Sequence, residues 1–389
     1  MRLPEHVAKD IFAQYGVPTM PSCLFSSADF ICGADRVREK IQKAGIKFPA
    51  VLKAQVPIGG RGKSGGIRFV DNLEQMIEES ESLLKGKIGG YQIDDVLLVE
   101  KAIYRDEWYL SIMLNRENKS PMLIFSTAGG IDIEENARLH PEKIIRSAIN
   151  PLRDLEDYTI RYIVSTAGLP MSYVDSLSRL IKKIYAIFLG YSSLLVEINP
   201  LVVTENGELI ALDAKMEVDE SSVDRFPILS EYRDKMTENP LIKEARRFNF
   251  LYIPIEDDGR IAVISNGSGM LMSCIDMISK GDMKVGSALD LGGGATAERI
   301  SEAVSITLSN NRINTVLINI FGGITRCDEV AAGLLKALEN DITTNKRIVV
   351  RLEGTNKDIG KSILSGSGDR IILAENLIEA VAALRRLAE

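Results

Sequence analysis

From about residue 255 onward, the sequence repeats one unit: a short β-branched apolar run, a glycine-rich turn, and a stretch with helical periodicity. A helical stretch follows each of the apolar runs, which lie at 260–265, 285–291, 315–321, 347–352 and 370–374. Strands that alternate with helices in this way predict a parallel, doubly wound sheet. Ligands of such sheets bind at the carboxyl ends of the strands, which directs attention to the glycine-rich turns.

The first half of the chain has a mixed pattern. Helical stretches alternate with candidate strands, and two apolar runs, LLVEINPLVVT and ELIALDAKM, are joined by the hairpin turn signal Glu205-Asn206-Gly207. This pattern favours an α+β region built from two subdomains. The charged segment 219–247 contains Pro227 and Pro240, and we expect it to connect the two halves.

Composition and charge exclude several classes of protein. The chain has 389 residues, 45% of them hydrophobic and 26% charged, and no run approaches the ~20 apolar residues of a membrane helix. A net charge of −7 argues against general nucleic-acid binding. The four cysteines are widely spaced, and the N-terminus has no apolar signal segment. We therefore expect a cytoplasmic protein without disulfides and without nucleic-acid or membrane partners.

The segment VLKAQVPIGGRGKSGG contains a fragment of a phosphate-binding P-loop. Pro57 stands where that motif requires glycine, and the loop leads into an apolar strand rather than a helix. What remains is a glycine-rich loop with Arg61 and Lys63, which suits triphosphate oxygens. Lys53 lies within an apolar strand and needs a partner such as a phosphate. The alternative is a surface hairpin whose Lys53 reaches out to solvent.

Carboxylates and one amide at strand ends are the next candidates. Glu100 ends an apolar strand and Glu107 follows it, so this edge could bind an adenine and its ribose, or simply expose charges to solvent. Asn199 and Asp213 both end apolar strands of the predicted hairpin and can face each other there. Mg²⁺ uses one or two such protein oxygens and completes its shell with phosphate and water. The alternative for Asn199 is a structural turn before Pro200.

The turns of the second half offer two readings. NGSGMLM resembles a dinucleotide-binding fingerprint with Asp290 as its ribose-binding acid, but Met272 stands at the position of its third glycine. Alternatively, the helices that follow the glycine-rich turns at residues 266–269, 292–296 and 322–325 start at one sheet edge. Their free N–H groups then suit a carboxylate or a phosphate. Tight turns without a ligand would account for one or two of them.

Taken in order, these motifs resemble the β subunits of succinyl-CoA synthetases, which are the nucleotide-binding subunits of ATP-grasp acid–CoA ligases. The resemblance spans the chain from EHVAKDIFAQYGVP through STAGGIDIEE and EINPLVVTENGELIALDAK to INIFGGITRCDEVAAG. It implies an α/β and α+β architecture with an ATP-grasp fold at 1–240, including a lid-like subdomain at about 21–102. A flavodoxin-like CoA-ligase domain is implied at 241–389.

The resemblance also implies roles for individual residues. The implied nucleotide contacts are Lys53, Gly60, Arg61, Gly62, Glu100, Ile103 and Glu107. Asn199 and Asp213 match Mg²⁺ ligands, and Glu197 matches a catalytic acid near a phosphohistidine loop. The implied carboxylate-substrate residues are Asn266, Gly323, Ile324 and Thr325. Thr325 stands where valine is common in the family, and its added hydroxyl would alter the preferred acid.

The implied reaction joins succinate and CoA at the expense of ATP or GTP, through a phosphohistidine on a partner α subunit that also binds CoA. An αβ or α2β2 assembly follows from this division of labour. His6 and His140 are the two histidines of the chain, and neither has a glycine-rich cradle. Three alternatives stay open: a ligase for malate, citrate or another acid, a nucleotide-binding module without turnover, and a carboxylate–amine ligase that leaves the second half unexplained.

Overall fold

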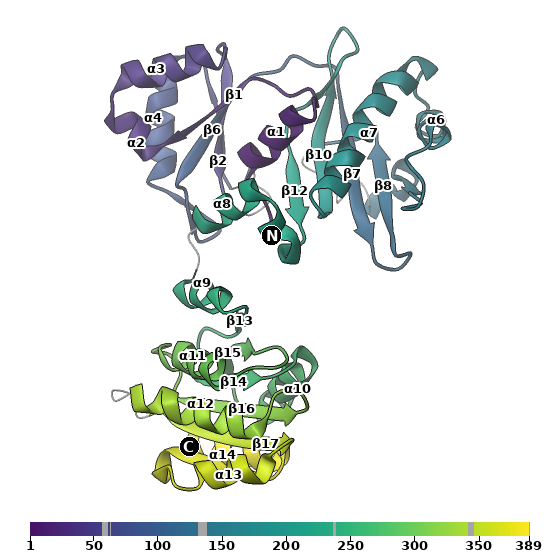
Figure 1. Ribbon diagram of the computed structural model, residues 1–389. Coiled ribbons are helices and arrows are strands. Elements are labelled where there is room, and N and C mark those ends of the chain that lie inside the picture. The colour runs from purple at the N-terminus through teal and green to yellow at the C-terminus, as the bar shows by residue number, and fades with distance from the viewer. Residues whose placement is uncertain (57–60, 63, 131–137, 236–238, 341–345, 389) are drawn as a thin grey trace. The chain divides into compact units, whose positions relative to one another are not determined.

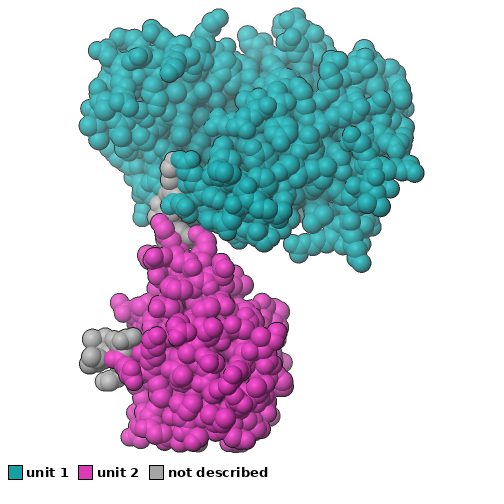
Figure 2. Space-filling view, viewed as in Figure 1, with its two compact units in different colours: residues 1–235 teal, residues 236–389 magenta. Residues whose placement is uncertain are grey.

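The computed structural model describes all of the chain except residues 57–60, 63, 131–137, 236–238, 341–345 and 389. The chain forms two compact units, residues 1–235 and 236–389 (Figure 2). This division falls a few residues before the domain boundary expected at 240/241. Each unit has its own sheets and its own hydrophobic cores.

The smaller sheet of the first unit has four antiparallel strands. Their order is β1 (Ser22–Ser26), β6 (Asp95–Glu100), β2 (Ala50–Gln55) and β3 (Ile67–Val70). Three helices cover it, as Figure 1 shows: α2 (Ser27–Ile31), α3 (Ala34–Lys43) and α4 (Leu73–Leu84). A two-stranded hairpin, β4 (Lys87–Ile88) and β5 (Tyr91–Gln92), follows α4. Because β3 pairs directly with β2, the glycine-rich loop between them returns into a strand, and the P-loop reading is excluded.

The larger sheet of the first unit has six strands. Their order is β11 (Leu209–Ala211), β10 (Ser193–Val203), β7 (Asp106–Asn115), β8 (Ser120–Ser126) and β9 (Ile145–Ala148), with β12 (Lys215–Val218) also paired to β10. The helices of its core are α1 (Glu5–Gln14), α6 (Asp157–Thr166) and α7 (Val174–Gly190). In Figure 1, α1 lies between the two sheets of the unit. This position places the first helix beside both sheets.

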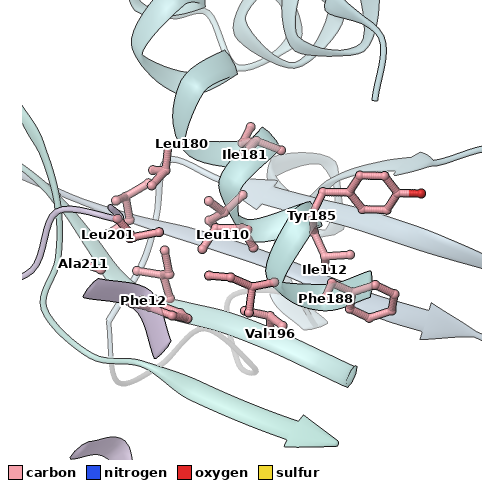
Figure 3. Close-up of a cluster of buried hydrophobic side chains, with 14 of the residues drawn as sticks. Phe12, Leu110, Ile112, Leu180, Ile181, Tyr185, Phe188, Val196, Leu201 and Ala211 are labelled. Atoms are coloured by element: carbon pink, nitrogen blue, oxygen red, sulfur yellow. The ribbon is translucent and has the colours of Figure 1, made fainter. Parts of the chain in front are cut away.

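Helix α7 shows why this sheet has a well-packed core. Its buried Leu177, Leu180, Ile181, Ile184 and Phe188 recur at the spacing of one helix face. In Figure 3 this face points onto the strands that carry the buried side chains of β7 and β10. The sequence analysis predicted no helix over residues 157–190, although the helical spacing of apolar residues is present there.

Two expectations about the first unit have different outcomes. The hairpin signal is confirmed, because β10 and β11 pair antiparallel around Gly207, whose φ is +81°. The run ELIALDAKM forms two strands, because residues 212–214 separate β11 from β12, so Asp213 lies near a strand end as expected. Asn199 does not end a strand, because β10 continues through it to Val203. The connecting segment contains a 3₁₀ helix (Glu220–Arg225), α8 (Pro227–Lys235) and α9 (Pro240–Arg247). Both prolines are the first residue of a helix. The lack of an N–H costs nothing there, because the first N–H groups of a helix have no intrahelical acceptor.

The second unit is the doubly wound sheet that the sequence predicts. The strand order is β13 (Leu251–Pro254), β15 (Val285–Asp290), β14 (Ile261–Ser265), β16 (Thr315–Gly322), β17 (Arg347–Gly354) and β18 (Ile371–Leu373). All neighbours are parallel except the edge strand β13, which is antiparallel to β15. The parallel strands follow the flavodoxin-like order 2-1-3-4-5, in which the order reverses between β14 and β16.

Helices cover both faces of this sheet, so its central strands read as continuous apolar runs. One core contains side chains of α10 (Ser268–Ser279) and α14 (Leu377–Ala388). The other contains side chains of α9, α11 (Ala297–Leu308), α12 (Cys327–Asn340) and α13 (Lys357–Leu364). Across the described ranges of both units, no helix has the length and apolarity that a membrane crossing requires.

Candidate functional site

A cluster of buried charges joins the two sheets of the first unit. Lys53 on β2 donates from Nζ to Oε1 of Glu5 at 2.7 Å, and Nη2 of Arg61 lies 2.8 Å from the other Glu5 oxygen. Nη2 of Arg61 also lies 3.3 Å from Oδ2 of Asp213, in the break between β11 and β12. Lys53 is therefore paired inside the protein and does not reach out to solvent. Two implied nucleotide residues and one implied metal ligand meet at this place.

The strand break places Asp213 opposite Asn199. Strand β10 pairs with β11 through Leu201 and Ala211, and with β12 through Glu197 and Lys215. The register is the same on both sides of the break, and within it the Leu212 amide donates to the Pro200 carbonyl at 3.2 Å. Asp213 therefore lies across the hairpin from Asn199. An amide oxygen and a carboxylate are ligands that suit a hard cation such as Mg²⁺.

The electrostatics of the cluster follow from its burial. Burial by itself would raise the pKa of Glu5, but the charges of Lys53, Lys9 and Arg61 outweigh it and hold that pKa well below its usual range. Burial raises the pKa of Asp213, and the nearby Glu5 carboxylate adds to this rise. A cation beside Asp213 would therefore favour its ionised form.

Two more predicted residues lie along the hairpin. Asn199 is held by the backbone of Gly130, to which it donates and from which it accepts a hydrogen bond. Glu197 lies two positions earlier on β10, and its Oε2 is 3.3 Å from Nζ of Lys215 and 3.4 Å from the hydroxyl of Tyr109. Its side chain is largely buried. The strand thus carries an acid and an amide two positions apart, each held by different partners.

The structure does not bring all predicted nucleotide residues into this cluster. Oε2 of Glu100, at the end of β6, accepts from the backbone of Lys47 at 2.9 Å, and Oε1 of Glu107, on β7, accepts from the Tyr104 hydroxyl at 2.6 Å. The two carboxylates therefore sit on different sheets, with residues 101–105 between them. The Ile103 side chain is 77% exposed, so a ligand would meet its backbone. Gly60 lies outside the described residues, and Gly62 lies in an exposed turn.

A second group of predicted residues lies at the strand ends of the second unit. Asn266 follows β14 and exchanges two hydrogen bonds with the backbone of Phe321 on β16, at 2.9 and 3.0 Å. This contact is at the point where the strand order reverses, the usual ligand position in this fold. Gly323 and Ile324 come directly after β16, and the Ile324 side chain is 86% exposed. Thr325 is buried, and its hydroxyl accepts from the amide of Gly294 at 3.1 Å.

Two other readings of these turns lose support. The oxygens of Asp290 accept from the Ser268 hydroxyl at 2.6 Å and from the Gly292 amide at 2.9 Å. A ribose bound by Asp290, as the dinucleotide-binding hypothesis requires, would have to displace these contacts. At the start of α11, the Ala297 amide donates to Glu329 at 3.0 Å. This helix start is therefore capped from within the chain rather than open to an anion. The hydroxyl of Thr325 is likewise occupied by a hydrogen bond within the protein, from the amide of Gly294.

The sequence reasoning missed Glu5 and Lys9. Both are almost fully buried on α1, beside Ala8 and Phe12, and lie one helical turn apart. The signal was available, because positions 5, 8, 9 and 12 share one helix face, and two charges among apolar residues on a buried face need partners. Among the described residues, no group of three or more His, Cys, Asp or Glu side chains forms a metal-binding cluster. The proposed cation site therefore depends on two protein oxygens.

Comparisons with known proteins define the class of the chain. Residues 2–203 match the ATP-grasp domain family, and residues 264–385 match the CoA-ligase family. The solved structure of ATP citrate lyase from Methanothrix soehngenii, in complex with citrate and coenzyme A, superimposes with a TM-score of 0.78. It covers 100% of this chain and 99% of its own at 16% identity, so it shows the fold alone. The predicted fold is confirmed: the chain is an ATP-grasp enzyme with a CoA-ligase domain.

Closer relatives narrow the class. The β subunit of the ADP-forming succinate–CoA ligase of Methanocaldococcus jannaschii is 38% identical over 370 residues, with 95% of both chains covered. The β subunit of the GDP-forming succinate–CoA ligase of Thermus thermophilus is 36% identical, with 99% of this chain and 98% of the relative covered. The chain belongs to the family of succinate–CoA ligase β subunits, as the resemblance of its motifs predicts.

Proposed function

We propose that this chain is the nucleotide-binding subunit of a succinate–CoA ligase that forms succinyl-CoA, a nucleoside diphosphate and phosphate. One observation carries the proposal: Lys53, Arg61 and Asp213 meet in one buried cluster, beside the Asn199–Asp213 pair of the hairpin. Two cations and an oxygen pair in one place suit a triphosphate with its metal ion. The full-length relatives support succinate as the acid.

In this proposal Asn199 and Asp213 hold Mg²⁺, which supplies charge neutralisation at the phosphates when bound. Lys53 and Arg61 bind phosphate oxygens, and the backbone of Gly60 and Gly62 lines the same phosphates. A second set of residues holds the base and ribose, namely Glu100, the backbone of Ile103, and Glu107. The relatives include ADP- and GDP-forming enzymes, so the proposal includes both ATP and GTP.

The phosphorylated histidine belongs to a partner α subunit in this proposal. The ring of His6 has Nδ1 3.2 Å from Oε1 of Gln55 and packs edge-on against Tyr232, which is a packing role on α1. The ring of His140 lies beside Glu142. The chemistry then runs in three transfers: the γ-phosphoryl group moves to the partner's histidine, then to succinate, and the CoA thiol displaces phosphate from the acyl phosphate. Glu197 orients that histidine near the nucleotide.

The carboxylate substrate is proposed to bind at the strand ends of the second unit. Asn266, Gly323, Ile324 and Thr325 surround this position. The exposed Ile324 suits contact with a partner subunit, in an αβ or α2β2 assembly whose α subunit also holds CoA. Because the Thr325 hydroxyl accepts from Gly294, it serves the loop and leaves the choice of acid to the exposed backbone around it.

The proposal is tested with γ-labelled ATP, Mg²⁺, this chain and the α-type protein that copurifies with it. We expect acid-labile phosphate on the partner and its discharge by succinate with CoA. Asp213→Ala should abolish the labelling while the protein stays folded. Discharge by citrate or malate but not by succinate would move the substrate to a related acid. Absence of label on both chains, with a partner shown active by other means, would overturn the ligase proposal.

A further inference from the structure

The charge cluster of the first unit holds one cation that the proposed function leaves without a task. Glu5 contacts three cations: Lys53 at 2.7 Å, Arg61 at 2.8 Å and Lys9 at 3.4 Å. Lys53 also donates to the carbonyl of Leu212, and Arg61 also donates to the carbonyl of Ala54 and to Asp213. Nζ of Lys9 lies close enough to Glu5 for an ion pair but has no hydrogen-bond partner among the described residues. Its side chain is only 3% exposed.

Nucleotide binding would disturb this arrangement, on the premise of the proposed function that Lys53 and Arg61 bind the phosphates. A triphosphate carries more negative charge than Glu5 and draws the same two cations toward itself. The Glu5 side chain is 1% exposed, so water cannot replace the partners it loses. A carboxylate left buried without a cation is strongly unfavourable. Phosphate binding is therefore favourable only if another cation stays with Glu5.

We infer that Lys9 is the counter-ion that keeps Glu5 paired when Lys53 and Arg61 bind phosphate. Lys9 lies one helical turn after Glu5 on the same buried face of α1, and a small movement of its side chain brings Nζ into hydrogen-bond range. When nucleotide is bound, each charged group of the cluster then has a partner of opposite charge. Glu5 stays with Lys9, Asp213 becomes free for the metal ion, and Lys53 and Arg61 face the phosphates. Lys9 is thus a positioning residue, which acts through Glu5.

The test is a double-mutant cycle on nucleotide binding by the complex of the full chain with its partner. Calorimetry with Mg²⁺ and the non-hydrolysable analogue AMPPNP gives the dissociation constants of wild type, Lys9→Met, Glu5→Gln and the double variant. We expect Lys9→Met to weaken binding about tenfold or more, because Glu5 loses its remaining cation. Adding Lys9→Met to Glu5→Gln should change the constant less than about twofold. Lys9→Arg, which keeps the charge, should bind nearly as wild type.

Lys85→Met is the matched control, because Lys85 pairs with Glu81 one helical turn away but lies 79% exposed. It should leave binding unchanged. Thermal unfolding without nucleotide reports folding, and Lys9→Gln replaces Lys9→Met if the latter does not fold. A Lys9 variant that binds AMPPNP as wild type, or an equal loss in the Glu5→Gln background, would overturn the inference. Failure of the wild type to bind either AMPPNP or GMPPNP would overturn the proposed function, whereas failure of the Lys9 variants to differ from the wild type would overturn only this inference.

Discussion

Asn199 and Gly130 hold each other through two hydrogen bonds. Oδ1 of Asn199 accepts from the Gly130 amide at 2.8 Å, and its Nδ2 donates to the Gly130 carbonyl at 3.1 Å. This pairing fixes which end of the side-chain amide is oxygen. A carbonyl oxygen has two lone pairs, so one remains for a cation held jointly with Asp213 across the hairpin. The contact would therefore orient this proposed metal ligand before a metal binds.

Asn199→Ala tests this orientation. The substitution removes one proposed Mg²⁺ ligand, and we expect the Mg²⁺ concentration for half-maximal activity to rise roughly tenfold or more. A titration of Mg²⁺ at saturating ATP measures the shift. Asn206→Ala, in the exposed turn of the same hairpin, is the control and should titrate as wild type. Identical titrations for both variants would remove Asn199 from the metal site.

The paired hydrogen bonds between Asn266 and Phe321 lead to a second prediction. They join the carboxyl ends of β14 and β16, where the carboxylate substrate is proposed to bind. Asn266→Ala should raise the KM for succinate about tenfold, because it removes a side chain that positions the acid, and leave the KM for ATP near the wild-type value. Asn376→Ala, which loses contacts to Glu379 after the edge strand β18, two strands from β16, should change neither. Equal changes in both KM values would indicate general damage.

Close backbone packing at the end of β17 leads to a third prediction. Gly354 has a φ of +103°, and a Cβ atom there would lie 2.0 Å from the carbonyl oxygen of Gly322. Gly354→Ala should therefore lower the free energy of unfolding by about 3 kcal/mol or more, since both the conformation and the space exclude a side chain. Gly366→Ala, with no neighbour within 4 Å, should stay within about 0.5 kcal/mol of wild type. Urea unfolding compares them.

Much of the fold could be predicted from the sequence because apolar residues recur with the period of a helix or a strand. The second unit alternates short apolar runs with helices, and its five parallel strands begin and end within a few residues of the predicted ranges, whereas the edge strand β13 was not predicted. The sequence predicted a strand end at Asp213 but not the second strand β12 that follows it at Lys215–Val218. β10 pairs with both segments, and the break between them holds Asp213 across the hairpin from Asn199. Pairing between strands that are distant along the chain produces no periodic pattern in the local sequence.

The charge cluster shows the same limit. The position of Lys53 within an apolar strand indicated that it needed a partner. The glycine-rich loop indicated that Arg61 could bind phosphate. Neither could reveal Glu5 as the partner, because it lies nearly fifty positions earlier along the chain. Spacing along one helix detects charges on a buried face, whereas tertiary structure alone decides which charges meet. The roles assigned to these residues stay predictions that the experiments above decide.

The last prediction concerns the pH dependence of stability. Burial lowers the pKa of Lys9 to about 8, with Glu5 opposing this shift, whereas a lysine of the unfolded chain titrates near 10.4. Between these values the unfolded chain keeps a proton that the folded protein has released. The unfolded state then binds more protons, so the free energy of unfolding rises with pH.

Wild type should therefore gain stability relative to Lys9→Met as the pH rises above 8, by at most about 1.4 kcal/mol per pH unit. Below that pH both states carry the proton, and the difference between the two proteins should be constant. Urea unfolding of both proteins from about pH 7 to about pH 9.5 measures the two curves, and the variant cancels every other titrating group. Parallel curves across this range would mean that Lys9 keeps an ordinary pKa, and that burial on α1 does not oppose its charge.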